Sequence, residues 1–237
     1  MVATIDDPTN APSAFPILFE DGDVLAVCKP EGLAAIPERA KERDSLLSSL
    51  QSLIPEKLYV VHRLDKAVSG VMLFAKNAAA HKCLNDQFAR REIAKTYVAL
   101  AHGVLRESEG TIDKPIRPFG SGRMGVDAKR GKPSTTSYEV LRRLGQYTLV
   151  NVHSSTGRRH QIRVHFYSVG HPIVGDRRYG ERKVQERFPR LMLHAAAISF
   201  RLPTGKTVTV EAAVPESFGA VLDTVVRPVR PRGDHEP

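Results

Sequence analysis

Short runs of apolar or alternating residues are spread along the chain and are separated by turn residues. Runs of this length, bounded by Gly, Pro, Asn or Asp, are typical of β-strands. The segments that predict strands are 15–20, 24–30, 70–76, 94–103, 134–144, 147–155, 192–202 and 206–214. The turns at Asp21-Gly22-Asp23 and Gly145-Gln146 join neighbouring segments and predict β-hairpins.

Other segments have apolar residues at helical spacing. The predicted helices cover residues 44–54, 77–91, 157–169 and 215–226. We expect Asp44 and Asn77 to cap the first two, and Ser155 or Thr156 to cap the third, because a side-chain oxygen there accepts an N–H of the first turn. Gly170 should end the third helix. An alternating strand also fits HQIRVHF, but the cap and the terminating glycine favour the helix.

Residues 105–133 follow neither pattern. They are rich in Gly, Pro, Arg and Lys, which predicts an exposed loop with room for one short strand and makes it a candidate RNA-contacting element. Strand segments outnumber helices and several are hairpin-linked, so we predict an α+β fold with a mixed, largely antiparallel β-sheet and flanking helices. One domain is expected over 15–226, with flexible tails at 1–14 and 227–237.

The chain is basic: 35 Lys and Arg stand against 26 Asp and Glu, for a net charge of +9. A polyanion such as nucleic acid is a reasonable partner for this charge. The cysteines, Cys28 and Cys83, form neither a disulfide framework nor a zinc motif, which favours a reducing compartment. No basic leader and no apolar run of about 18 residues stands out, so we expect a cytoplasmic protein without a membrane span.

The sequence His62-Arg63-Leu64-Asp65 stands just before an apolar run that begins at Val71. A carboxylate in a loop that a buried strand holds is a common arrangement for catalysis. The alternative is a turn in which Asp65 only bonds its own backbone.

The string HRLDKAVSGVMLFAK resembles the HRLD motif of RluA-type pseudouridine synthases. AKTYVAL, GRRHQIRVH, GHPIVGDRRYG and LMLHA resemble later motifs of that family in the same order, and KPEGL and RMGVDAKRGKPSTTSYEVL resemble further segments. The resemblance covers about residues 16–215 and is to the shorter members, which lack a separate N-terminal RNA-binding domain. It implies a pseudouridine synthase fold and isomerisation of uridines in rRNA, tRNA or both, with no cofactor, no metal and no obligate protein partner. A monomer is expected.

The resemblance also implies roles for individual residues. Asp65 matches the catalytic carboxylate, Tyr97 the residue that packs on the target uracil, and Arg163 the residue that pairs with the carboxylate. Arg63 matches an arginine that enters the RNA, and Leu193 a residue near the uracil pocket. The remaining residues that we expect to bind substrate RNA are His62, Arg158, Arg159, Lys129 and Arg130.

Ordinary structural roles compete with these assignments. Tyr97 and Leu193 fit simple packing, while Arg63 and Arg163 fit surface salt bridges or solvated positions. Arg159 stands where the family usually has Thr, which exchanges a hydroxyl for a possible phosphate contact. His160 and His165 are five residues apart, so they do not share a helical face as zinc ligands would.

Two further functions remain open from the sequence. A non-catalytic RNA-binding or RNA-chaperone protein on the same fold would explain the charge but gives no reason for the acid, tyrosine and arginine at family positions. A glycoside hydrolase would need a second acid, for which Glu92 and Asp176 are available.

Overall fold

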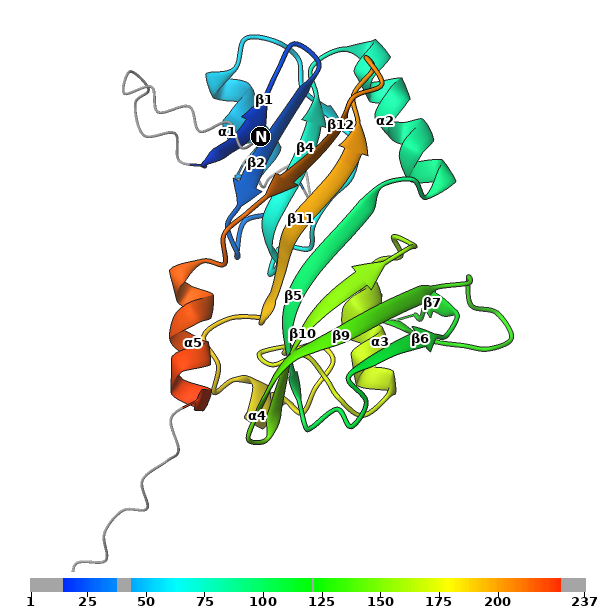
Figure 1. Ribbon diagram of the computed structural model, residues 1–237, viewed down its shortest axis with the longest axis vertical. Helices are drawn as coiled ribbons and strands as arrows, with labels where there is room; N and C mark the ends of the chain where they lie inside the picture. The colour runs from blue at the N-terminus through cyan, green and yellow to red at the C-terminus, as the bar shows by residue number, and fades with distance from the viewer. Residues whose placement is uncertain (1–14, 38–43, 121, 227–237) are drawn as a thin grey trace, which may run out of the picture. The chain divides into compact units, whose positions relative to one another are not determined.

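The computed structural model describes residues 15–37, 44–120 and 122–226 (Figure 1). The chain forms two compact units. Unit 1 contains the described residues up to Ile93 together with Ala197–Ala212, and unit 2 contains Ala94–Ala196 and the described residues from Ala213. The predicted tails at 1–14 and 227–237 lie outside the described residues, and the single domain over 15–226 stays a prediction.

Unit 1 is a sheet with two helices. Its elements are β1 (Ile17–Glu20), β2 (Val24–Lys29), α1 (Leu46–Leu53), β3 (Tyr59–Val60), β4 (Ser69–Ala75), α2 (Ala78–Arg90), β12 (Thr207–Glu211) and the end of β11 (Leu193–Arg201). The strand order is β1-β2-β4-β11, with β3 on β4 and β12 on β11. The pairs β1–β2, β2–β4, β3–β4 and β11–β12 are antiparallel.

Successive residues of β2 and β4 point into two different cores. Val24 and Val71 belong to a core that α2 completes with Ala80 and Leu84. Leu25 and its neighbours on the other face form a second core with Leu46 and Leu50 of α1. Because a strand alternates its side chains between faces, β2 and β4 need apolar residues at nearly every position, which explains the continuous apolar runs.

Unit 2 contains a second group of antiparallel strands. Its elements are β5 (Ala94–His102), β6 (Glu109–Asp113), β7 (Ile116–Pro118), β8 (Met124–Val126), β9 (Thr135–Leu144), β10 (Tyr147–Ser154), α3 (Gln161–Ser168), α4 (Arg182–Gln185), the start of β11 and α5 (Glu216–Val226). The order is β11-β5-β10-β9-β6, and β7 with β8 forms a separate two-stranded sheet (Figure 1). Ile116, Met124, Val164 and Tyr179 form a core between this small sheet and α3.

The predicted α+β class with a mostly antiparallel sheet is confirmed, and both predicted hairpins form. The interpretation of 105–133 as a loop with one short strand was wrong, because β6, β7 and β8 all lie there. β6 pairs with β9, and Ile112, Ile116 and Met124 are buried. The apolar residues of these strands stand singly between polar ones. Such a pattern predicts a strand only when the strand that pairs with it is known. The short elements β3 and α4 were not predicted.

Two predicted helix starts were also wrong. Ser45, not Asp44, caps α1, since its Oγ accepts the N–H of Ser48 at 3.1 Å. Helix α3 begins at Gln161 with no side-chain cap, because Thr156 Oγ1 donates to the Gln161 side chain at 2.7 Å. Asn77 caps α2 as predicted, accepting from Ala80 N at 2.8 Å. Gly170 follows the end of α3 with φ +84°, as predicted for a terminating glycine.

The helices are short. The longest, α2, has 13 residues, against the roughly 20 that a bilayer crossing takes. Within the described ranges no helix combines the length and the apolar character of a membrane span.

Asn77→Ala tests how α2 is anchored. The Asn77 side chain caps the helix and also donates to Asp23 Oδ1 at 2.8 Å, so its loss should lower the free energy of unfolding by about 1 kcal/mol in urea denaturation. Asn85→Ala, inside the same helix, is the control and should cost nothing, because alanine favours helix interiors. Equal losses in both variants would contradict the capping role.

Candidate active site

The loop that carries Asp65 lies in unit 1, directly before β4. The Asp65 carbonyl accepts the N–H of Val68 at 3.0 Å and closes a turn. Leu64 is buried, Arg63 is exposed and Asp65 is half-buried. Every residue of β4 is buried. The carboxylate therefore stands on a backbone that the core holds, and it retains access to solvent.

Lys29, at the end of β2, fixes this loop from inside. Its side chain is fully buried, and Nζ donates to the carbonyls of Pro30, Leu33 and Lys66 at 2.7, 2.8 and 3.2 Å. The N–H of Gly32 also donates to the Lys66 carbonyl at 2.8 Å. A buried ammonium needs such acceptors, because removal from water is costly. Lys29 thus ties the segment 30–33 to the residue that follows Asp65, a role that the sequence did not reveal.

His62 holds the other side of the loop. Its Nε2 accepts the backbone N–H of Leu73 in β4 at 3.0 Å, and its ring lies 5.2 Å from that of Phe88. A ring nitrogen that accepts a hydrogen bond carries no proton, so the imidazole is neutral. This contact positions the loop, whereas the predicted contact of His62 with RNA stays a prediction.

Arg163 lies on α3 of unit 2 and is held by Asp176. Its Nε and Nη2 donate to the two oxygens of that carboxylate at 2.7 and 2.8 Å. Both residues are buried, with exposed fractions of 7% and 1%. The pair uses two of the five guanidinium donors and fixes the plane of the group. The predicted pair of Arg163 with Asp65 joins residues of different units and stays a prediction.

The backbone around Asp176 explains the glycine before it. Oδ1 of Asp176 also accepts the N–H groups of Arg178 and Tyr179, at 3.0 and 3.1 Å. Gly175 has φ +76°, and a Cβ there would stand 1.8 Å from the carbonyl oxygen of Arg190. Only glycine fits this turn, which places the carboxylate of Asp176 against Arg163.

A second network fixes the segment before α3. Gln161 Nε2 donates to Thr135 O, Thr136 Oγ1 and Ser154 Oγ at 2.9, 3.1 and 2.9 Å. Gln161 Oε1 accepts the N–H of Arg158 at 3.0 Å. The backbone that carries Arg158 and Arg159 is therefore anchored. Arg159 is exposed, and Nε of Arg158 is buried without a hydrogen-bond partner among the described residues.

The remaining predicted RNA-binding residues also lie in unit 2. Tyr97 is half-buried on β5 opposite Val152 of β10, and Leu193 is buried at the start of β11. Lys129 and Arg130 are exposed in the turn after β8, where their N–H groups donate to Asp127 Oδ1 at 2.9 and 3.0 Å. These contacts and the neighbouring Arg117 hold the pKa of Asp127 below its usual range.

Lys95 is a further lysine near the candidate site that the sequence did not single out. It stands two positions before Tyr97, and its Nζ passes close to Gly157, at 3.7 Å from the place of a Cβ there. Burial lowers the pKa of its ammonium. The signal that could have identified Lys95 was its position in the AKTYVAL motif, two residues before Tyr97.

The histidine of α3 has structural partners. His165 accepts from Thr136 Oγ1 at Nδ1 and donates from Nε2 to the Lys114 carbonyl, at 2.8 and 2.9 Å. Burial lowers the pKa of His165, which favours the neutral ring. Across 15–37, 44–120 and 122–226 no three His, Cys, Asp or Glu side chains gather as metal ligands would.

The two acids that a glycoside hydrolase could use are paired with arginines. Asp176 holds Arg163, and Oε2 of Glu92 accepts from Nη2 of Arg201 within unit 1. Each carboxylate is thus already engaged by a guanidinium group, which weakens the glycoside hydrolase interpretation.

Comparison with known families agrees with the motifs. The model of the RNA pseudouridylate synthase family matches residues 23–168. The chain therefore belongs to this family: it is an RNA pseudouridine synthase, an isomerase. The predicted resemblance is confirmed, and the enzyme is favoured over the non-catalytic RNA-binding protein.

Individual relatives cover most of the chain. The dual-specificity RNA pseudouridine synthase RluA of Vibrio vulnificus is 42% identical over 79% of this chain and 78% of its own. Ribosomal large subunit pseudouridine synthase D of Nitrosomonas europaea is 35% identical over 94% and 69%. The structure of human RNA pseudouridylate synthase domain containing 1 superposes with a TM-score of 0.74 at 32% identity, covering 93% of this chain and 90% of that one.

Lys29→Met tests the anchor of the Asp65 loop. Methionine fills similar space but donates nothing, so the three carbonyls lose their shared donor. We expect the free energy of unfolding to fall by at least about 2 kcal/mol, because each buried acceptor left unsatisfied costs about 1–3 kcal/mol and the Lys66 carbonyl keeps the N–H of Gly32. Lys82→Met, on the exposed face of α2, should change denaturant unfolding little. A stable Lys29→Met protein would contradict the anchoring role.

Asp176→Ala tests the buried ion pair. Removal of one partner leaves the Arg163 charge buried, which typically costs about 3–5 kcal/mol. Glu186→Ala is the matched control, because Glu186 pairs with Arg182 on the exposed surface of α4 and its end. Thermal and urea unfolding should separate the two variants clearly, and similar small losses in both would show that the buried pair is unimportant.

Proposed function

We propose that this enzyme isomerises specific uridines in rRNA, tRNA or both, with Asp65 as the catalytic carboxylate. The observation that carries the proposal is the half-buried Asp65 of the family's HRLD motif, on a loop that buried Lys29 and β4 hold. A reacting group on a fixed backbone needs no reorganisation when the substrate arrives.

The reaction needs little beyond position and charge. The N1–C1′ bond of uridine breaks, the uracil turns, and C5 bonds to C1′; C5 gives up its proton and N1 takes one, so the atoms balance. An ionised carboxylate serves this sequence as a nucleophile or by stabilising positive charge on the sugar. No oxidant, donor or metal enters the balance.

Access to C1′ and C5 requires the uridine to leave the stack of bases. We assign Tyr97 and Leu193 to the flat and apolar contacts of the extruded uracil, and Arg63 to the space that the base leaves. The exposure of Arg63 supports this assignment, because its planar guanidinium can stack among bases. Arg163 is assigned to the carboxylate of Asp65, and its fixed plane supports a directional contact.

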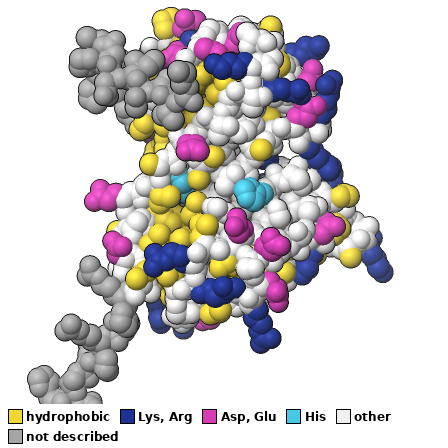
Figure 2. All heavy atoms as spheres, viewed as in Figure 1, with side chains coloured by type: hydrophobic (Ala, Val, Ile, Leu, Met, Phe, Trp, Pro, Cys, Tyr) yellow, Lys and Arg dark blue, Asp and Glu magenta, His cyan; other side chains and the backbone are white. Residues whose placement is uncertain are grey.

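Grip on the RNA comes from phosphate contacts. Arg158 is half-buried and its backbone is held by Gln161, so the exposed part of its side chain is placed for a phosphate contact. The exposed side chains of Arg159, Lys129 and Arg130 add charge. Figure 2 shows basic and acidic side chains interspersed over the face in view, so the overall charge of +9 alone does not mark the site. Relatives named for dual specificity and for the ribosomal large subunit support rRNA or tRNA as substrate.

Asp65→Asn tests the catalytic assignment. The amide is nearly isosteric but uncharged, so pseudouridine formation should fall about 1,000-fold or more while RNA affinity stays within about twofold. Tritium release from RNA labelled at C5 of uridine measures turnover, and filter binding measures affinity. Asp86→Asn, an exposed acid on α2, should retain full activity. Normal turnover by Asp65→Asn would remove Asp65 from the mechanism.

A further inference from the structure

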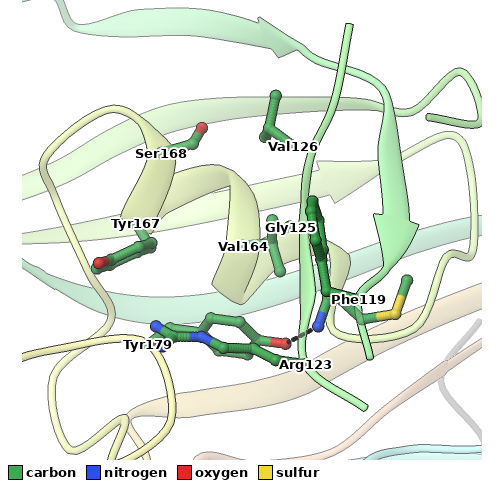
Figure 3. A pocket seen from close by; sticks show the side chains of 9 residues that line it. Phe119, Arg123, Gly125, Val126, Val164, Tyr167, Ser168 and Tyr179 are labelled. Atoms are coloured by element: carbon green, nitrogen blue, oxygen red, sulfur yellow. Dashed lines mark hydrogen bonds between the residues drawn. The ribbon is translucent and has the colours of Figure 1, made fainter. Parts of the chain in front are cut away.

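A cavity of about 340 Å³ opens within unit 2 between the β7–β8 hairpin, α3 and Tyr179 (Figure 3). Small-molecule sites usually occupy about 300–1,000 Å³, so this one suits a single ring system with its substituents. Asp65, Tyr97 and Arg163 are not among its lining residues. The ring centre of Tyr179 lies 5.2 Å from the guanidinium carbon of Arg163, so the cavity adjoins one of the residues predicted to act on the target uridine but is not formed by them.

Flat rings and one guanidinium dominate its walls. Tyr167 and Phe119 line the cavity with exposed fractions of 47% and 39%, whereas Tyr179 is 1% exposed. The guanidinium carbon of Arg123 lies 5.4 Å from the ring centre of Tyr167 and 5.2 Å from that of Tyr179 (Figure 3). Aromatic faces and arginine planes are the groups on which nucleobases stack.

Two of the three rings, Tyr179 and Phe119, are held in place by contacts within the protein. Tyr179 Oη accepts the N–H of Met124 at 3.0 Å and bonds Nδ1 of His160 at 2.7 Å. The guanidinium of Arg117 covers Phe119 at 4.2 Å. A Cβ at Gly125 would lie 2.7 Å from the Phe119 ring, so the glycine lets the ring lie against the hairpin. Binding therefore costs little ordering of these two rings.

The hairpin around the cavity carries strong positive charge. Residues 114–132 contain six basic side chains and one acid, which gives 6 − 1 = +5 of the net +9 of the chain. Asp127, the one acid, is occupied by Arg117 Nε at 2.6 Å and by the N–H groups of Lys129 and Arg130. An RNA with unpaired bases matches both features. Its phosphates suit the basic residues of the hairpin, and its bases suit the aromatic side chains that line the cavity.

We propose that this cavity binds an unpaired nucleobase of the RNA substrate, separate from the uridine that reacts. The base stacks on Tyr167 and Phe119 beside Arg123, and the adjoining phosphates contact the basic residues of the hairpin. The cavity would hold a second nucleotide of the RNA, besides the uridine that reacts, and so contribute to selection of the RNA substrate. This inference rests on the RNA substrate of the proposed function but not on the role of Asp65.

Tyr167→Ala tests the stacking. Each stacked base contributes about 1–3 kcal/mol, so affinity for a mixed-sequence 20-nucleotide single-stranded RNA should fall about 5- to 150-fold. Tyr167→Phe keeps the ring and should bind like the wild type. Tyr147→Ala is the control, since the Tyr147 ring packs at an angle against His102 and Phe188 and does not line the cavity. Wild-type affinity of Tyr167→Ala, or an equal loss in Tyr147→Ala, would overturn the proposal.

Photocrosslinking of the unaltered enzyme gives an independent test. Irradiation at ultraviolet wavelengths with total RNA from a strain that lacks the gene should attach nucleotides to peptides containing Tyr167 or Phe119, as read by mass spectrometry. Adducts on other peptides alone would contradict the site. Asp65→Asn should give the same adducts, so failure of the catalytic assignment and failure of this cavity are distinguishable.

Discussion

A charge removed from water must have fixed partners, and this constraint shapes both segments on which the proposed chemistry depends. In unit 1 the buried ammonium of Lys29 donates to carbonyls of two loops, and one of these carbonyls belongs to the residue that follows Asp65. In unit 2 the buried guanidinium of Arg163 donates hydrogen bonds to both carboxylate oxygens of Asp176. Because each buried cation needs its hydrogen-bond partners, a shift of the local backbone would break those hydrogen bonds and leave the charge unpaired. Rigidity at the functional side chains is a consequence of these costs.

The regular elements were predictable where one residue pattern sufficed. β2 and β4 show continuous apolar runs because α1 and α2 cover opposite faces of their sheet. Asn77 was predictable as a cap because its partner is three residues away. The strands β6 to β8 were not, because their apolar residues gain meaning only from β9, from α3 and from each other.

The same distinction applies to the functional residues. The proposed roles of Asp65, Tyr97 and Arg163 come from the family motifs and not from the pattern of apolar and polar residues. Lys29 and Asp176 were visible as letters of KPEGL and GHPIVGDRRYG, but their roles depend on partners 37 and 13 residues away. The start of α3 was misplaced for a similar reason: Thr156 bonds the Gln161 side chain instead of a backbone N–H. Long-range hydrogen bonds thus account for much of what the sequence left open.

Isomerisation of uridine neither adds nor removes atoms, so catalysis depends on how the substrate is positioned. We propose that this enzyme brings an extruded uridine to a fixed carboxylate. The most direct test incubates the purified wild-type protein with total RNA from a strain that lacks its gene and maps pseudouridine before and after. We expect new pseudouridine at one or a few defined uridines of rRNA or tRNA. An unchanged map, with the protein folded and RNA-bound, would contradict the proposed reaction.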